Sequence, residues 1–515
     1  MTSTRGFVLS LAAIAAVSTL ALRAQSQIGS EDPAVQYQFA NDLFEAGRFR
    51  DALDLYGLAT QSKDPGLVVR ARKGRVRTAL RTADFDLALV EAETLAKDAP
   101  SDGEADTLLG DALWAIGMFD EADTSYGKAL KETPDSSRAR FGLARSLSTR
   151  NRLDEALTEA KAVAALAPRD AEVHALVGQI YERQNRYEDA AAAFEAYINL
   201  VPNGEDSTMA TLFQSKVRLL RSFKGKVPME LESNVPALTR VPFRLVNNKI
   251  VLQGRVNRVP VEFVLDTGSE RTGLSEATAR RAGVAPVTQT LTAGVGMTSL
   301  RRLGLGRADS IEIGQLRMKN VPVAIRSTAR EGLPRWQSES FSPLAQGLSL
   351  VVDYQRKEVL LGRTIPDSNA NIRLPMRMNR LPLVRGMLNS SRPAYFVVDT
   401  GGELISISAE TALALAMVPS RRIPLRVYGM SGLDENAFLL PGVNLDFDEI
   451  NYRNVGLAVL NLRAPSILLG FQLGGIVGHS FLGEYRVSID MGRSELRLEK
   501  TDAAALKPAL TRSSN

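Results

Sequence analysis

The stretch VEFVLDTGSERTGLS runs from Val261 to Ser275, and a second stretch, AYFVVDTGGELISIS, runs from Ala394 to Ser408. In each, a short apolar run that is typical of a buried strand ends in Asp-Thr-Gly. At average residue usage, one such triplet arises by chance in roughly one chain of this length in ten. Two copies, 133 residues apart and both at the end of an apolar strand, indicate a duplicated unit that supplies one aspartate from each half.

The sequence around the triplets also repeats. Residues 228–365 map onto residues 366–500 with few changes in length, and Gly254 and Gly386 precede the two aspartates by 12 and 13 residues. Both halves consist of short alternating or clustered apolar runs, which predict β-strands. We therefore expect two related β lobes, followed by a disordered polar tail at residues 501–515.

Two β lobes with one Asp-Thr-Gly each resemble the aspartic proteases, specifically a retropepsin-like lobe that occurs twice in one chain, as in pepsin. The resemblance implies an all-β bilobal fold and a catalytic dyad of Asp266 and Asp399. Two carboxyl groups about 3 Å apart share one proton, because both cannot ionise easily. The charged member activates a water molecule and the neutral member polarises the peptide carbonyl. Such hydrolysis requires neither a metal ion nor another cofactor.

The resemblance also implies supporting roles for the rest of each triplet. Thr267 and Thr400 are expected to hydrogen-bond across to the opposite lobe and so fix the dyad geometry. Gly268 and Gly401 are expected to let the backbone turn sharply and to place amides near the carboxyl groups.

The residue after each triplet differs between the lobes. Ser269 is expected to donate a hydrogen bond to Asp266, whereas Gly402 has no side chain to do so. This difference leads to the hypothesis that Asp266 is the ionised partner at the working pH.

Aspartic proteases cover the cleft with a glycine-rich hairpin flap, and both lobes carry a candidate. LTAGVGMTSLRR contains Gly294 and Gly296, and RVYGMSGLDE contains Tyr428 and Gly429. Ordinary surface hairpins are the alternative interpretation.

Each lobe of the family also carries two apolar residues followed by glycine, which brace the catalytic loop. Lobe 2 has this motif at Ile476, Val477 and Gly478, whereas lobe 1 reads WQSESFSPLAQGLSLVVDY, with serines and Pro343 instead. The sequence therefore predicts weaker support for Asp266.

The first half of the chain repeats with a period of 34 residues and resembles the tetratricopeptide repeat over residues 34–204; five repeats and a capping helix would form an array over residues 34–224. The resemblance implies an all-α solenoid of helix pairs that ends in a capping helix, with a concave face that binds a peptide or protein partner. A mere spacer is the alternative.

Each repeat has a large residue at the turn: Phe49, Phe85, Phe119, Leu153 and Tyr187. An alanine follows three positions later, at Ala52, Ala88, Ala122, Ala156 and Ala190, where two helices should approach closely. A proline is expected to close each unit: Pro65, Pro100, Pro134, Pro168 and Pro202.

The amino-acid composition excludes several kinds of active site. The 515 residues include no cysteine and only two histidines, which excludes thiol nucleophiles, disulfides and Cys/His zinc sites. We expect both histidines, His174 and His479, to be structural. The net charge of +5 is spread over 63 basic and 58 acidic residues without long runs, which does not indicate nucleic-acid binding.

Residues 1–24 have the features of a secretory signal: one early arginine, an apolar run and small residues near its end. The sequence therefore predicts a secreted or periplasmic protein without a membrane span after cleavage. An uncleaved N-terminal anchor is the alternative.

Taken together, these features predict an exported aspartic endopeptidase that acts on a protein or peptide substrate and binds a protein partner through its repeats. Two other interpretations remain open: a non-catalytic scaffold that binds extended peptides, and an enzyme in which the lobes of two chains pair.

Overall fold

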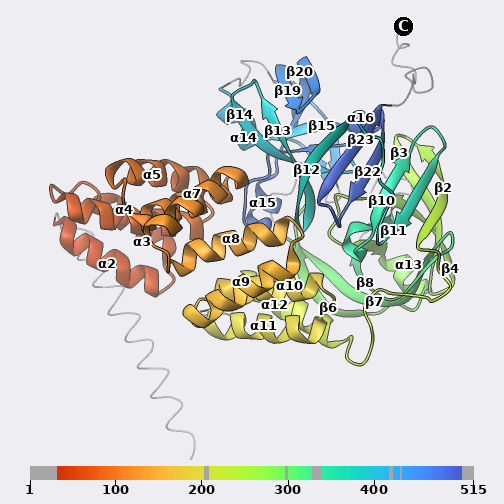
Figure 1. Ribbon diagram of the computed structural model, residues 1–515, viewed down its shortest axis with the longest axis horizontal. Helices are drawn as coiled ribbons and strands as arrows, with labels where there is room; N and C mark the ends of the chain where they lie inside the picture. The colour runs from red at the N-terminus through yellow and green to blue at the C-terminus, as the bar shows by residue number, and fades with distance from the viewer. Residues whose placement is uncertain are drawn as a thin grey trace, which may run out of the picture. The chain divides into compact units, whose positions relative to one another are not determined.

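The computed structural model describes residues 32–201, 208–295, 300–326, 338–416, 422–429 and 432–500 (Figure 1). The predicted signal peptide and C-terminal tail lie outside these residues. Among the described helices, none is long and apolar enough to cross a membrane.

The first part of the chain forms helix pairs, as the 34-residue period predicts (Figure 1). Each second helix begins at the large residue of its repeat, two positions after a residue with positive φ. Gly or Asn, which tolerate this left-handed conformation, occupies four of the five turns, and Ala83 occupies the other. The helices are α2 (Pro33–Glu45), α3 (Phe49–Ala59), α4 (Pro65–Arg81), α5 (Phe85–Asp98), α6 (Gly103–Ala115), α7 (Phe119–Glu132), α8 (Ser137–Thr149), α9 (Leu153–Leu166), α10 (Ala171–Arg183), α11 (Tyr187–Leu200) and α12 (Thr208–Arg221).

The five repeat alanines are all fully buried, which confirms the close helix approach that the sequence predicts. The repeat prolines agree only in part with the prediction that each one closes a repeat. Pro100, Pro134 and Pro168 follow the ends of α5, α7 and α9, whereas Pro65 is the first residue of α4. A proline at that position loses no helical hydrogen bond, so Pro65 begins a helix instead of closing a unit. Pro202 lies outside the described residues.

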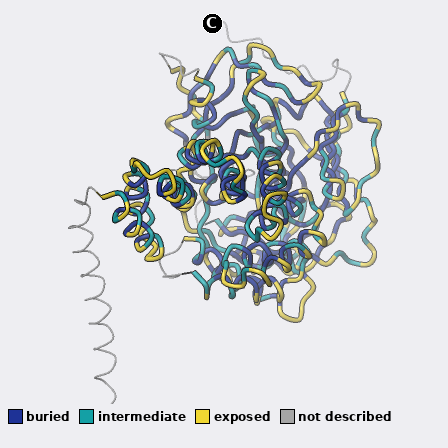
Figure 2. Tube along the Cα trace, turned by 60° about the vertical axis from the view of Figure 1, so that its left-hand side comes forward, coloured by how far each residue is buried: buried dark blue, intermediate teal, exposed yellow. Residues whose placement is uncertain are grey.

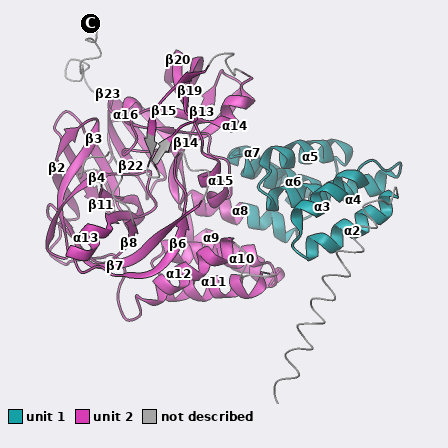
Figure 3. Cartoon of the chain, turned by 180° about the vertical axis from the view of Figure 1, so that it is seen from behind, with its two compact units in different colours: residues 1–142 teal, residues 143–515 magenta. Residues whose placement is uncertain are grey.

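The chain divides into two compact units, Met1–Gly142 and Leu143–Asn515 (Figure 3). The division falls inside α8, so the last repeats and the capping helix α12 belong to the same unit as the β lobes. In the first unit, Tyr126 is fully buried and its ring fills the space that side chains at Gly110 and Gly142 would need.

The two β lobes repeat one pattern of strands. Buried residues run through both the helices and the lobes (Figure 2). In lobe 1 the order is β1 (Glu230–Leu231), β2 (Leu238–Val246), β3 (Lys249–Val256), β4 (Val259–Leu265), β5 (Thr272–Ser275), α13 (Glu276–Arg281), β6 (Pro286–Thr292), β7 (Arg301–Ile313), β8 (Leu316–Arg326), β9 (Ser340–Phe341), η2 (Leu344–Gln346), β10 (Ser349–Asp353) and β11 (Glu358–Gly362).

In lobe 2 the corresponding order is β12 (Ile372–Asn379), β13 (Leu381–Leu388), β14 (Arg392–Val398), β15 (Ile405–Ser408), α14 (Ala409–Ala414), β16 (Ile423–Pro424), β17 (Val427–Gly429), β18 (Gly432–Asp434), β19 (Phe438–Phe447), β20 (Ile450–Leu460), α15 (Arg463–Leu469), β21 (Gly475–Val477), α16 (His479–Leu482), β22 (Tyr485–Asp490) and β23 (Glu495–Lys500). Equivalent hairpins, β3–β4 and β13–β14, lead into the two triplets.

Six strands, three from each lobe, form one sheet that joins the lobes in the order β2-β11-β10-β22-β23-β12. Its central pair, β10 and β22, is antiparallel and places Val351 opposite Ser488. These two residues occupy equivalent positions in the duplicated sequence. The lobes of a single chain are therefore related by an approximate two-fold axis through this pair.

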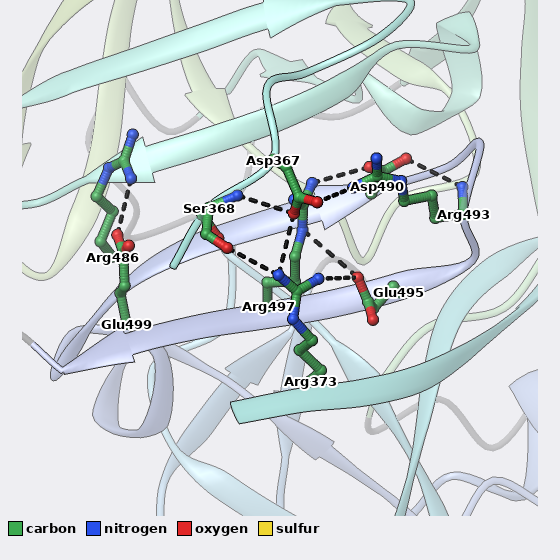
Figure 4. Close-up of polar contacts among 9 residues, drawn as sticks. All are labelled: Asp367, Ser368, Arg373, Arg486, Asp490, Arg493, Glu495, Arg497 and Glu499. Atoms are coloured by element: carbon green, nitrogen blue, oxygen red, sulfur yellow. Dashed lines mark hydrogen bonds and ion pairs between the residues drawn. The ribbon is translucent and has the colours of Figure 1, made fainter. Parts of the chain in front are cut away.

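Ion pairs reinforce the lobe 2 side of the joining sheet (Figure 4). Arg497 of β23 is fully buried, and its guanidinium lies 2.8 Å from Asp490 and 2.6 Å from Asp367. Asp490 also accepts a 3.0 Å hydrogen bond from the backbone amide of Arg493 in the β22–β23 turn. A buried cation without partners is costly, so this network fixes the turn and the segment that enters lobe 2.

Candidate active site

Asp266 and Asp399 lie at equivalent positions, each one residue beyond a strand of its own lobe, β4 or β14. A side-chain carbon at Gly401 would lie 3.0 Å from Cγ of Asp266 and 3.1 Å from Oδ1 of Asp399. One at Gly268 would lie 2.5 Å from Cγ of Asp399. The two carboxyl groups are therefore neighbours where the lobes meet, and the triplet glycines leave the room that they need.

The predicted cross-lobe hydrogen bonds of the triplet threonines are present. Thr267 Oγ1 donates to the carbonyl of Val398 at 2.6 Å and accepts from the amide of Thr400 at 3.0 Å. Thr400 Oγ1 donates to the carbonyl of Leu265 at 2.9 Å and accepts from the amide of Thr267 at 3.2 Å. Both hydroxyl groups are buried, and each donates one hydrogen bond and accepts one across the lobes, so each lobe fixes the triplet loop of the other.

The surroundings of Asp399 favour its neutral form. Burial raises the pKa of this carboxyl group, and the effect outweighs the lowering by Lys249 and by the backbone amides of Gly401, Gly402 and Gly268. The Gly401 amide donates to Oδ1 at 2.8 Å. A buried carboxylic acid that keeps its proton can donate a hydrogen bond to a substrate carbonyl.

The predicted hydrogen bond from Ser269 to Asp266 is wrong. Ser269 Oγ instead donates to the carbonyl of Arg271 at 2.9 Å, inside its own loop, and a hydroxyl group has only one proton to donate. The hypothesis that Asp266 is the ionised partner therefore loses its original basis. The raised pKa of Asp399 now favours the same assignment for a different reason.

The lobe 1 brace, which the sequence predicts to be weak, has the same backbone geometry as its lobe 2 counterpart. β9 pairs in parallel with β4, and the amide of Asp266 donates to the carbonyl of Phe341 at 2.9 Å. In lobe 2, β21 pairs in parallel with β14, and the amide of Asp399 donates to Val477 at 3.0 Å. The brace depends on backbone groups, so the serines of lobe 1 do not remove it.

Ser342 shows how lobe 1 replaces the glycine of the motif. In lobe 2 a side chain at Gly478 would lie 2.7 Å from the backbone of Gly402, so only glycine fits. In lobe 1 the buried Ser342 hydroxyl donates to the carbonyl of Ser269 at 2.5 Å. In lobe 2 the amide of His479 makes the equivalent bond, to Gly402.

We expect Ser342→Ala to lower the free energy of unfolding by about 1–2 kcal/mol, because the carbonyl of Ser269 loses its buried donor. Denaturant unfolding measures the change, and Ser480→Ala, at an exposed position, serves as the control. Equal stability of the two variants would show that this hydroxyl does not brace the loop.

Both flap candidates are β-hairpins. In lobe 1, β6 and β7 pair from Pro286 to Thr292, and Gly294 lies in the connection, whereas Gly296 lies outside the described residues. In lobe 2, β17 and β18 form a separate two-stranded ribbon that contains Tyr428 and Gly429. The hairpin conformation is confirmed, and the flap role stays a prediction.

A pair of cross-lobe ionic contacts, which the sequence analysis missed, holds the loops after the triplets. Arg380, between β12 and β13 of lobe 2, lies 2.7 Å from Glu270 of lobe 1. At the equivalent place in lobe 1, Lys249 lies 3.5 Å from Glu403 of lobe 2 and donates to the carbonyl of Gly401. The glutamate four residues after the aspartate of each Asp-Thr-Gly triplet was the available signal.

Both histidines make contacts outside the dyad. His479 begins α16, and its ring packs edge-on against Tyr354 with centroids 5.2 Å apart. Burial lowers the pKa of His479. His174 Nε2 lies 3.0 Å from the carbonyl of Pro168 in the repeats. Within the described part of the chain, no cluster of three acidic or histidine side chains is arranged to hold a metal ion.

This fold and site define a two-lobed module of the aspartic-protease type that follows an array of helical repeats. Comparison with known families agrees: the aspartyl protease family model matches residues 252–363, and tetratricopeptide repeat models match residues 37–104, 113–180 and 171–203. The chain thus carries tetratricopeptide repeats and an aspartyl-protease-like region.

Similarity to individual proteins is partial. A TPR repeat-containing protein of Treponema pallidum (strain Nichols) is 33% identical over 96 residues, which are 19% of this chain and 12% of that protein's length. Among solved structures, the aspartic proteinase from Irpex lacteus is 15% identical with a TM-score of 0.34, covering 52% of this chain and 100% of that one. A thermophilic TPR protein of Thermus thermophilus is 19% identical with a TM-score of 0.31, covering 36% of this chain and 99% of that one.

Proposed function

We propose that this chain is an aspartic endopeptidase. The observation that carries the proposal is the pair of neighbouring carboxyl groups, Asp266 and Asp399, on loops that Thr267 and Thr400 hold symmetrically across the lobes. A lobe 1 without its brace would favour the non-catalytic scaffold, but the backbone pairing of β9 with β4 supplies that brace although the sequence motif is absent. The lobes of one chain pair directly, so the site does not require a second chain.

The proposed reaction assigns one role to each carboxyl group. Ionised Asp266 takes a proton from a water molecule as the water oxygen attacks the peptide carbonyl carbon. Neutral Asp399 donates a hydrogen bond to the carbonyl oxygen, and a carboxylic proton then passes to the leaving nitrogen as the C–N bond breaks. The groups return to a single shared proton when both products leave.

A mixed peptide library tests this proposal. We expect the purified protein to cleave internal peptide bonds between about pH 3 and pH 7, where a dyad can hold one proton. A pepstatin-like inhibitor should abolish cleavage, whereas a metal chelator should not change it. Absence of cleavage of any peptide, or cleavage that the inhibitor leaves intact, would contradict the proposal.

Lys249 provides a test through pH dependence. Its ammonium group lowers the pKa of Asp399, so Lys249→Met should raise that pKa further. Activity requires one protonated carboxyl group and declines as pH rises through the higher dyad pKa. The alkaline limb of the kcat/KM profile should therefore move to higher pH. Lys319→Met, which removes a half-exposed lysine paired with Glu232, is the control and should leave the limb in place. A shift to lower pH would refute this role of Lys249.

We also propose that the protein is exported and that its repeats bind a protein partner. The signal-like residues 1–24 support export, and the repeat helices support the binding role. Mass spectrometry of the protein recovered from the natural host tests the first point, since a cleaved signal shortens the N-terminus. An intact N-terminus would favour an uncleaved anchor instead.

A further inference from the structure

One acidic side chain of the repeats reaches the catalytic loop of lobe 1. Glu182, in the last turns of α10, lies 3.3 Å from the guanidinium of Arg271 through Oε1. Its other oxygen, Oε2, lies 2.5 Å from Nζ of Lys216 on the capping helix α12. Arg271 is five residues beyond Asp266, and Ser269 inside the same loop donates to its carbonyl. A helix of the array is thus linked to the loop that carries one member of the dyad.

The contact is shielded from solvent. The side chains of Glu182, Arg271 and Lys216 are each only 19% exposed. Burial raises the pKa of Glu182, but the two cations outweigh burial and lower it to about 2. A shielded carboxylate loses much of its stabilisation when a partner is removed, so this contact constrains both elements more than a surface pair does.

The capping helix makes a second contact with lobe 1. α12 packs against β6, and Ser215 Oγ lies 2.6 Å from the carbonyl of Gln289, nearer than its other acceptor, the carbonyl of Thr211 at 2.9 Å. β6 is the first strand of the lobe 1 flap candidate. The array therefore contacts both the catalytic loop and the hairpin that the sequence assigns to the cover of the cleft.

The arrangement is asymmetric, which argues against a general feature of the duplicated fold. The position equivalent to Arg271 in lobe 2 is Leu404, a residue that is 47% exposed. The cross-lobe pair of Arg380 and Glu270 has a lobe 2 equivalent, whereas the contact with Glu182 has none among the described residues. In this part of the chain, only the Asp266 loop combines cross-lobe support with support from the repeats.

We propose that Glu182 is a positioning residue for the active site, which it holds in place through Arg271. The last repeats and the capping helix would then support the geometry of the active site, in addition to any role in binding a partner. This inference rests on the proposed peptidase function for its kinetic consequence, but its structural consequence can be measured without catalysis.

Hydrogen exchange of the full-length protein tests the structural consequence. The amides of Asp266 and Thr267 are hydrogen-bonded, so their exchange reports opening of the loop. We expect Glu182→Gln to speed exchange in a peptide that covers residues 266–271 by roughly tenfold. Glu195→Gln, which breaks an exposed pair with Arg221, is the matched control and should leave this peptide unchanged.

Arg271→Gln approaches the same contact from the loop and serves as the second variant if Glu182→Gln unfolds. In the double variant, the acceleration should be no larger than in Glu182→Gln alone, because Arg271→Gln removes an interaction that Glu182→Gln has already removed. Unchanged exchange in folded Glu182→Gln and Arg271→Gln variants would overturn the proposal.

Kinetics tests the functional consequence. We expect Glu182→Gln to lower kcat by roughly tenfold with little change in KM, because it disturbs the dyad and leaves the substrate-binding surface intact. Faster exchange without a change in kcat would also overturn the positioning role. If the wild-type protein cleaves no peptide, the peptidase proposal fails while the exchange result still decides whether Glu182 holds the loop.

Discussion

Asparagine in place of Asp266 or Asp399 is expected to lower kcat for peptide cleavage by about 10⁴-fold or more, the size of effect seen when a member of a catalytic constellation is removed. An amide cannot take a proton from water, nor can it share one acidic proton with its neighbour. Initial rates on the best library peptide, measured at several pH values, give the change. Because the two groups act as a unit, the double variant should be no less active than either single one.

The control for this pair is Asp309→Asn, which makes the same chemical change at a side chain that is 75% exposed. It should retain full activity. A dyad variant that keeps more than a tenth of the wild-type kcat would contradict the proposed chemistry.

Stability measurements at several pH values show whether an inactive Asp399→Asn variant has lost its catalytic group or its fold. Because burial raises the pKa of Asp399, the folded state binds this proton more tightly than the unfolded state does. The stability that depends on the proton is present at low pH and is lost as pH rises through the folded-state pKa. Asp399→Asn should therefore unfold less readily than wild type near pH 7, with a smaller difference near pH 4. An inactive variant with this profile is folded.

The sequence predicted the repeats well because their signals are local. A large residue two positions after a left-handed turn begins each second helix, and an alanine three positions later allows the helices to approach. Both effects involve residues within about one turn of helix, so the local amino-acid pattern is enough to predict them. The two aspartates of the dyad were predictable for another reason. The duplicated sequence carries one Asp-Thr-Gly triplet in each lobe, so each half of the site has its own local motif.

The errors at the site concern groups whose partners are set by tertiary structure. The motif for the lobe 1 brace was absent, yet β9 supplies the required backbone groups with Ser340 and Phe341. The direction of the Ser269 hydroxyl depends on the local path of the loop. Glu182 and Arg271 are 89 residues apart, and no period or motif connects them. Such contacts require the packed structure.

Thr400→Val is expected to lower the free energy of unfolding of the lobes by about 3 kcal/mol. The Thr400 hydroxyl is buried and makes two hydrogen bonds, to the carbonyl of Leu265 and from the amide of Thr267. Valine has nearly the same shape but leaves both backbone groups unpaired, at about 1–3 kcal/mol each. Guanidinium unfolding measures the change, and kcat should fall as well because each lobe no longer fixes the other's loop.

Thr239→Val provides the matched control for this substitution. Thr239 is fully buried in β2, and its hydroxyl has no hydrogen-bond partner among the described residues. Replacing an unpaired buried hydroxyl with a methyl group removes a desolvation penalty, so this variant should be as stable as wild type or more stable. Equal losses from the two substitutions would mean that the cost comes from packing. A loss confined to Thr400→Val would assign it to the cross-lobe hydrogen bonds, the contacts on which the geometry of the dyad depends.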